Sequence, residues 1–231
     1  MAAAASEPVR RHGAPRLVVD VWSDVMCPWC YLGHTLLGQA LEQFPHAEHT
    51  QIRHHSYQLM SDLAAGTEEG LTEYLVRRRG FPRAQIEAMN AQIAARGAVA
   101  GLDINSGQAV AANTRAAHQL IHFAARAGRQ QEMVQRLFRA YFTDGLNVGD
   151  HRVLATLAEE AGLDAAAAAK ALESGTFDNE VEADLRRAQQ LGISGVPFFV
   201  FADKYALSGG QPVEAFLTAL TTAWQELSDT P

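Results

Sequence analysis

The fold of this chain is decided by the stretch Asp24-Val-Met-Cys-Pro-Trp-Cys-Tyr-Leu-Gly33, which follows the β-branched run Arg16-Leu-Val-Val-Asp-Val-Trp22. That run predicts a strand over residues 16–22. After the cysteines, apolar residues recur at helical spacing as far as Pro45, at Leu32, Leu36, Leu37, Ala40, Leu41 and Phe44. The Cys27-Pro28-Trp29-Cys30 motif is therefore predicted to stand where a strand ends and a helix begins.

This position gives the two cysteines a physical basis for redox chemistry. A helix N-terminus has unpaired N–H groups and a partial positive charge, so it stabilises an anion, which we expect to be the Cys27 thiolate. A thiolate is the attacking species in disulfide exchange. Cys30 lies one helical turn further on, with its sulfur on the same face, near enough to attack a mixed disulfide on Cys27. The motif predicts a nucleophile, Cys27, and a resolving thiol, Cys30.

A CxxC motif can also be half of a zinc site. The chain has no further cysteine, so zinc would need two more ligands, for which His54-His55 and the i, i+4 pair His118 and His122 are candidates. No HExxH motif accompanies that pair, and isolated histidines are more often packing or surface residues. We favour the redox pair and predict no metal and no cofactor, because the cysteines themselves carry the electrons.

Composition narrows the class of protein. The chain has 231 residues, 48% of them hydrophobic, and a formal net charge of −7, which suits one globular domain or one domain with a large insertion. Net negative charge argues against nucleic acid, and we interpret Arg77-Arg78-Arg79 as a solvated helix face. No apolar run approaches the roughly 18 residues of a membrane span. Two arginines follow the Ala-rich start, so residues 1–15 are predicted to be a flexible tail in a cytoplasmic protein.

The sequence pattern changes twice along the chain. The alternating segment Thr50 to Leu59 predicts a second strand, and the periodicity is then helical almost throughout from about 68 to 191. Phe198–Phe201 and Tyr205–Ser208 flank a short turn, which predicts a hairpin, and an amphipathic helix closes the chain. The predicted division is a tail (1–15), a first β-α-β part (16–65), a helical insertion (66–177) and a second part (178–231) of helix, hairpin and helix. None of these features indicates an oligomeric state.

Four ordered segments resemble the DsbA family of thiol–disulfide oxidoreductases, and in particular its cytosolic FrnE-like branch. They are the cysteine stretch 24–33, Asn113-Thr-Arg-Ala-Ala-His-Gln-Leu120, Gly192-Ile-Ser-Gly-Val-Pro-Phe-Phe-Val200 and Ser208-Gly-Gly-Gln-Pro212. The resemblance implies an α/β thioredoxin-like fold interrupted by an all-helical insertion.

The resemblance also implies a cis peptide bond between Val196 and Pro197, beside Cys27. A cis proline there would expose the backbone of Val196, which can pair with an extended substrate peptide as an added strand does. On the residues alone, a proline that begins an edge strand is the favoured interpretation of Pro197.

Several further residues are candidates with alternatives left open. Asp24 is a candidate acceptor for the proton of the second thiol, or else a helix cap or a solvated carboxylate. His118 belongs to the insertion, which in this family closes over the active site, and is a candidate neighbour of Cys27 or a histidine packed between helices. Trp29, with Pro28, is expected to form a partly exposed substrate contact or to pack. Gln211 is another candidate neighbour of the site, whereas Tyr31, Leu32, Trp22 and Trp224 are expected to be structural.

The expected function is exchange of disulfides with protein or peptide thiols and disulfides, with glutathione as a further candidate partner. The alternative is a glutathione-dependent isomerase or transferase, because kappa-class glutathione transferases and 2-hydroxychromene-2-carboxylate isomerases have a similar layout. Those relatives typically carry Ser where Cys27 stands and lack the second cysteine, which argues against this alternative. A third hypothesis is a binding module that uses the apolar run Phe198–Phe201, although buried strands have the same composition.

Overall fold

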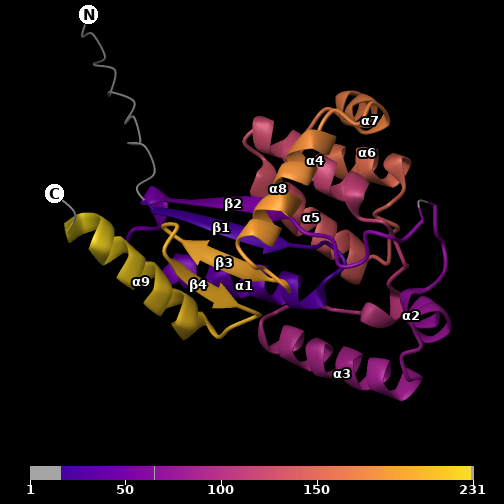
Figure 1. Ribbon diagram of the computed structural model, residues 1–231, viewed down its shortest axis with the longest axis horizontal. Coiled ribbons are helices and arrows are strands. Elements are labelled where there is room, and N and C mark those ends of the chain that lie inside the picture. The colour runs from indigo at the N-terminus through magenta and orange to yellow at the C-terminus, as the bar shows by residue number, and fades with distance from the viewer. Residues whose placement is uncertain (1–16, 65, 230–231) are drawn as a thin grey trace, which may run out of the picture.

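One mixed four-stranded sheet organises the molecule (Figure 1). This computed structural model describes residues 17–64 and 66–229, so the predicted tail 1–15 lies outside the described residues. The strands are β1 (Leu17–Ser23), β2 (Thr50–Ser56), β3 (Phe198–Phe201) and β4 (Tyr205–Ser208). Their order is β2-β1-β3-β4, with β1 and β2 parallel and the other neighbours antiparallel. The sheet thus brings both ends of the sequence together around the central strand β1.

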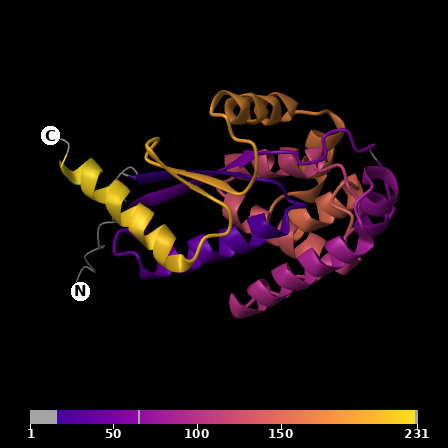
Figure 2. The same ribbon diagram turned by 60° about the horizontal axis from the view of Figure 1, so that its bottom comes forward.

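Helices cover both faces of this sheet (Figure 2). On one face lie α1 (Pro28–Gln43) and α9 (Val213–Asp229), and on the other lies α8 (Asp178–Gln190). Alternate strand residues point to opposite faces, so Val19, Val21, Phe199 and Phe201 share a buried core with α1 and α9. Trp22 faces the other way, against Ala188 and Ile193. This alternation decides which strand side chains meet α8.

The long middle segment is a helical block with a second core. Its six helices are α2 (Leu71–Arg79), α3 (Arg83–Val99), α4 (Arg115–Arg126), α5 (Gln130–Phe142), α6 (His151–Glu160) and α7 (Ala165–Glu173). Phe138 and Tyr141 are among its fully buried side chains, and the same core includes Cys27 and Cys30. Gly128 and Gly162, just past the ends of α4 and α6, have positive φ values of 69° and 78°. The block therefore packs directly against the cysteine motif.

The predicted α/β fold with an all-helical insertion is confirmed, and its predicted elements all form. The second strand is shorter than the predicted 50–59, since it ends at Ser56. Beyond that end, the N–H of Leu59 donates to the Asp24 carboxylate and not to a neighbouring strand. The side chains of Arg77, Arg78 and Arg79 are exposed, as expected of a solvated helix face. Among the described residues, no helix combines the length and apolar character that crossing a membrane requires.

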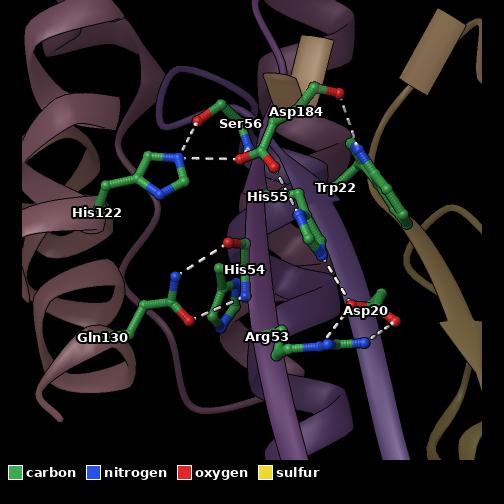
Figure 3. Close-up of polar contacts among 9 residues, drawn as sticks. All are labelled: Asp20, Trp22, Arg53, His54, His55, Ser56, His122, Gln130 and Asp184. Carbon is green, nitrogen blue, oxygen red and sulfur yellow. Dashed lines mark hydrogen bonds and ion pairs between the residues drawn. The ribbon is translucent and has the colours of Figure 1, made fainter. Parts of the chain in front are cut away.

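The outer edge of β2 is closed by side chains from the helices (Figure 3). The Gln130 amide, at the start of α5, accepts from the N–H of His54 and donates to its carbonyl, both at 3.0 Å. The N–H of Ser56 donates to the carboxylate of Asp184 on α8 at 2.8 Å. Two successive outward-facing positions of this edge strand are therefore paired with the helical block and with α8.

Candidate active site

The structure places the CxxC motif at the junction of β1 and α1. Cys27 is the N-cap residue of α1, and Pro28 occupies the first helical position, where a missing N–H costs nothing. The Cys27 carbonyl accepts from the N–H of Cys30 at 2.9 Å and from that of Tyr31 at 3.3 Å. Cys27 therefore stands at the positive end of the helix, and Cys30 lies one turn along it.

Both cysteines are free thiols and are almost fully buried, with exposed fractions of 4% for Cys27 and 1% for Cys30. Burial raises the pKa of the Cys30 thiol well above its ordinary value, and the neighbouring Cys27 sulfur raises it further. Cys30 consequently keeps its proton at neutral pH. A resolving attack by Cys30 needs a nearby group that can accept this proton.

The Val196–Pro197 peptide bond is cis and lies beside the nucleophile. The Cys27 thiol donates to the Val196 carbonyl, with a sulfur–oxygen distance of 3.6 Å. Gly33 allows the loop to approach α1, because a Cβ atom there would lie 3.1 Å from the Pro197 ring and from Phe199. Pro197 precedes β3, which lies between two other strands, so the interpretation that it begins an edge strand is wrong.

A buried carboxylate and imidazole lie in the same core as the cysteines. Asp24 is fully buried, so it is neither solvated nor the helix cap. One of its oxygens accepts from the N–H of Leu59 at 2.7 Å, and the other lies 3.4 Å from Nε2 of His118 on α4. The other ring nitrogen of His118, Nδ1, is buried with no hydrogen-bond partner among the described residues. Burial and the Asp24 charge both raise the pKa of Tyr141, which places this phenol near the same carboxylate.

Trp29, between the cysteines, lies at the rim of an apolar groove. The Arg96 guanidinium lies over its ring, 5.3 Å from the ring centroid. Gly210 lies so close that an added Cβ would be 3.4 Å from Leu32 and 3.6 Å from Trp29. The groove beyond has a volume of about 560 Å³ and runs between α1, α3 and the start of α9, with the main lining side chains Leu32, Leu36, Ala95, Val99, Pro212 and Val213. A substrate side chain could occupy it while the cysteines react.

The weaker sequence expectations have mixed outcomes. Tyr31 is buried and stacks on Phe138, and Trp22 is buried, as expected of structural residues. Trp224 is only partly buried, at the edge of its core. The Gln211 amide donates to the Ser208 carbonyl at 2.6 Å, which stabilises its own turn rather than the cysteines. Among the residues that the structure describes, no three His, Cys, Asp or Glu side chains are grouped so that they could hold a metal ion.

One polar cluster was missed by the sequence interpretation. His55 and His122, considered there only as zinc ligands, meet the carboxylate of Asp184 on α8 (Figure 3). No signal in the sequence joins them, because His55 and Asp184 are 129 positions apart.

Comparison with known proteins gives consistent matches. Residues 18–221 match the model of the DSBA-like thioredoxin domain family. A probable DsbA oxidoreductase, SCO1869 from Streptomyces coelicolor, is 36% identical, with a TM-score of 0.85 over 93% of this chain and 92% of that one. The cytosolic disulfide reductase DsbM from Pseudomonas aeruginosa is 21% identical, with a TM-score of 0.65 over 90% and 99% of the chains. A 2-hydroxychromene-2-carboxylate isomerase is 15% identical, with a TM-score of 0.68 over 93% and 99%. The last two likenesses concern the fold alone.

Proposed function

The chain belongs to the DSBA-like thioredoxin domain family, and on that premise we propose that its Cys27–Cys30 pair exchanges disulfides with protein, peptide or small thiol substrates. The observation that carries the proposal is the position of Cys27. It caps α1, its sulfur contacts the Val196 carbonyl, and Cys30 follows one turn later. A thiolate at this helix end is stabilised by the helix dipole, and the second thiol is within reach of any mixed disulfide formed on the first.

The exchange proceeds in two balanced steps. The Cys27 thiol first releases its proton to solvent, and the thiolate attacks a substrate disulfide. A Cys27–substrate S–S bond forms, the substrate S–S bond breaks, and one substrate sulfur leaves as a thiolate that takes up a proton. Cys30 then loses its proton and attacks the Cys27 sulfur, which expels the other substrate thiolate. The substrate gains two electrons and two protons, and the cysteine pair loses the same. The reverse sequence donates a disulfide to a dithiol.

Asp24 and His118 are the proposed acceptors for the Cys30 proton. The carboxylate is fully buried, and its charge acts on the Cys30 thiol. His118 contacts the carboxylate and has a ring nitrogen without a partner among the described residues, so it can share the proton once it has moved. A positioned base of this kind contributes about 10²–10⁴-fold to a proton-transfer step.

Substrates are proposed to dock on the two sides of Cys27. An extended peptide can pair with the backbone of Val196, and an apolar side chain can enter the groove beyond Trp29 and Pro28. Arg96 and Glu214 both line that groove, so it offers one cationic and one anionic contact to a charged substrate such as glutathione. DsbM has been solved with GSH, and that likeness suggests the same small thiol as a probe for this chain. The cytoplasmic location and the FrnE-like branch stay predictions.

The glutathione-dependent isomerase or transferase remains the second hypothesis. Its support is the likeness to the 2-hydroxychromene-2-carboxylate isomerase, which at 15% identity concerns the fold alone. Two cysteines stand in the site where such relatives typically lack them, so disulfide exchange is the better proposal. Calorimetric titration of a Cys27→Ser, Cys30→Ser variant with glutathione separates non-covalent binding, which the second hypothesis requires, from exchange.

The decisive experiment is reduction of insulin in the presence of dithiothreitol. The wild type should accelerate insulin precipitation, and Cys27→Ser should return the rate to that of buffer. Cys30→Ser is the matched control, because when it is mixed with insulin in the absence of dithiothreitol it should still trap substrate as a mixed disulfide on Cys27, seen by mass spectrometry. Equal activity of wild type and Cys27→Ser would reject the proposal and favour a binding module. Equilibration of the pair with glutathione buffers, followed by thiol trapping, then determines the direction of exchange.

A further inference from the structure

Asp184 is the centre of a buried network that joins three elements (Figure 3). One of its carboxylate oxygens lies 2.7 Å from Nδ1 of His55 on β2. The other accepts from the N–H of Ser56 at 2.8 Å and lies 2.9 Å from Nε2 of His122 on α4. The carboxylate therefore connects α8 to β2 and to α4 through three polar contacts.

His55 is held as a cation in this network. Its Nε2 lies 2.7 Å from an Asp20 oxygen, so the ring bridges two carboxylates, and Trp22 stacks on it with ring centroids 4.5 Å apart. Hydrogen bonds and charges from Asp184 and Asp20 overcome burial and raise the pKa of His55 to about 9. Arg53 adds a second cation against Asp20 at the surface. The positive charges of His55 and Arg53 thus balance the negative charges of Asp20 and Asp184. Both nitrogens of the His55 ring are in contact with a carboxylate.

This network is not a hydrolytic triad. Ser56 and Asp184 both contact His122 through the same nitrogen, Nε2, whereas a serine–histidine–aspartate triad uses opposite nitrogens of the ring. Ser56 is also buried, which denies its hydroxyl to a substrate. The network lies around a polar hollow of about 400 Å³, apart from the groove at Trp29. Its geometry is suited to fixing the positions of α8, β2 and α4 relative to one another.

Two structural routes lead from this network to the candidate active site. His122 lies one helical turn after His118 on α4, so the contact of His122 with Asp184 limits the movement of the helix that carries His118. Ser56 lies three residues before Leu59, whose N–H donates to Asp24. Both long-range contacts of Asp24, with Leu59 and with His118, thus belong to segments that Asp184 holds.

We infer that Asp184 is a positioning residue for disulfide exchange, which fixes the Asp24–His118 pair beneath Cys30 by holding α4 and the end of β2. The inference rests on the proposed function. The titratable groups around Asp24 are Cys30 and Cys27 from the α1 segment, His118 from α4 and Tyr141 from α5. Displacement of α4 changes the surroundings of the Cys30 proton and leaves the helix end at Cys27 in place.

The chain offers a matched control for this inference. Arg115 at the start of α4 also reaches α8, where it contacts Asp178 at 2.8 Å and Glu182 at 2.7 Å. These carboxylates are nearly half exposed, and solvent weakens such pairs. Glu182→Gln therefore removes a contact between the same two helices without touching the buried network.

The test separates the two steps of exchange with an aromatic disulfide reagent, 5,5′-dithiobis(2-nitrobenzoate). Attack by Cys27 releases the first coloured thiolate in a second-order phase, and attack by Cys30 releases the second in a first-order phase. Asp184→Asn should leave the first phase unchanged, slow the second by at least about tenfold, within the range that a positioned base supplies, and change its pH profile. Glu182→Gln should leave both phases as in wild type.

A double-mutant cycle with His118→Phe decides whether Asp184 acts through His118. In the His118→Phe background, Asp184→Asn should slow the second phase by less than it does in wild type, because the route through α4 is already removed and only the route through Leu59 to Asp24 remains. Additive effects, or an unchanged second phase in a folded Asp184→Asn, would overturn the inference. If Asp184→Asn does not fold, His122→Phe, which removes only the His122 contacts with Asp184 and Ser56, replaces it with the same expectations. A wild type that releases no thiolate at all would reject the proposed function and the inference together.

Discussion

Helix α4 carries two histidines one turn apart, and each contacts a buried carboxylate. The two contacts differ in how completely their polar atoms are hydrogen-bonded. His122 contacts Asp184, whose oxygens also accept from Ser56 and face His55, at distances of 2.7–2.9 Å. His118 contacts Asp24 at a long 3.4 Å, and its other nitrogen has no partner among the described residues. The first region is saturated with hydrogen bonds, and the second is left incomplete in a drier place.

This difference separates a structural role from a chemical one. A fully satisfied polar network stabilises one arrangement and resists change. A buried polar atom without a partner costs about 1–3 kcal/mol, a cost that is retained where an unfilled bonding position is useful. Beneath Cys30, the unfilled position is where a proton can be received. The saturated network of Asp184 and the incomplete pair of Asp24 should therefore respond differently to substitution.

The largest expected effect is on stability, from breaking the saturated network. Asp184→Leu leaves the His55 cation with one carboxylate and the Ser56 N–H without its acceptor, so the free energy of unfolding should fall by about 3–5 kcal/mol. Equilibrium unfolding in urea at pH 7 measures this loss. Glu182→Gln should change the free energy by less than about 0.5 kcal/mol. A loss below about 1 kcal/mol for Asp184→Leu would contradict the structural role.

The next effect concerns alkaline pH and His55. The folded pKa of His55, about 9, lies above its ordinary 6.5, so the folded protein binds this proton more tightly than the unfolded chain. The resulting stability, about 2–3 kcal/mol after allowance for partial exposure, is complete below pH 6.5 and lost as pH rises through 9. Unfolding curves from pH 6 to 10 should converge for wild type and His55→Gln. Parallel curves would show that His55 is not held as a cation.

The neighbouring His54 should act at the opposite end of the pH scale. Burial, together with the charge of the nearby His34, lowers its pKa to about 3, and burial lowers the pKa of His34, whose ring centroid is 5.3 Å away, to about 4. The folded protein excludes these protons, so stability is complete above pH 6.5 and falls as pH drops toward 3. The exclusion of a proton from His54 alone should lower the free energy of unfolding by about 2 kcal/mol as the pH falls from 6.5 to 5. His54→Leu should flatten this acid limb, and an unchanged slope would contradict the assignment.

The smallest effect on stability is expected at the incomplete pair. His118→Phe removes one long contact and an unpartnered nitrogen, so the free energy of unfolding should change by about 1 kcal/mol or less. The same variant should slow the Cys30 step by about tenfold or more, because proton transfer loses a participant. Urea unfolding and the two-phase thiolate assay measure the two quantities on one sample. A large loss of stability with an unchanged Cys30 step would make His118 structural.

Local pattern was sufficient to predict most of the fold. The run before Cys27, the helical spacing after it and the hairpin pattern of residues 198–208 all concern neighbours in sequence, and each predicted element forms. The cysteine motif was predicted on the same grounds, since a strand followed by a helix places Cys27 at a helix end. Leu59 departs from its strand pattern because a buried carboxylate, invisible to periodicity, takes its N–H.

Long-range partners were not predictable from local pattern. His54 and His55 are adjacent in sequence and lie on opposite faces of the sheet, as strand alternation requires, yet nothing local shows that one face is apolar and the other holds two carboxylates. Asp184 is 129 positions from His55. His118 was a candidate neighbour of Cys27 only through a family resemblance, and its contact with Asp24 depends on the path of α4.

The pairing of the Gln130 amide with the His54 backbone has a consequence for how these molecules behave when crowded. An exposed edge strand is a template on which other chains can add strands, the first step of aggregation. On β2, the Gln130 amide imitates the hydrogen-bonding groups of a neighbouring strand, and the Asp184 carboxylate occupies the next outward position. The side chains that join the helices to β2 thus also block this edge of the sheet from pairing with strands of other molecules.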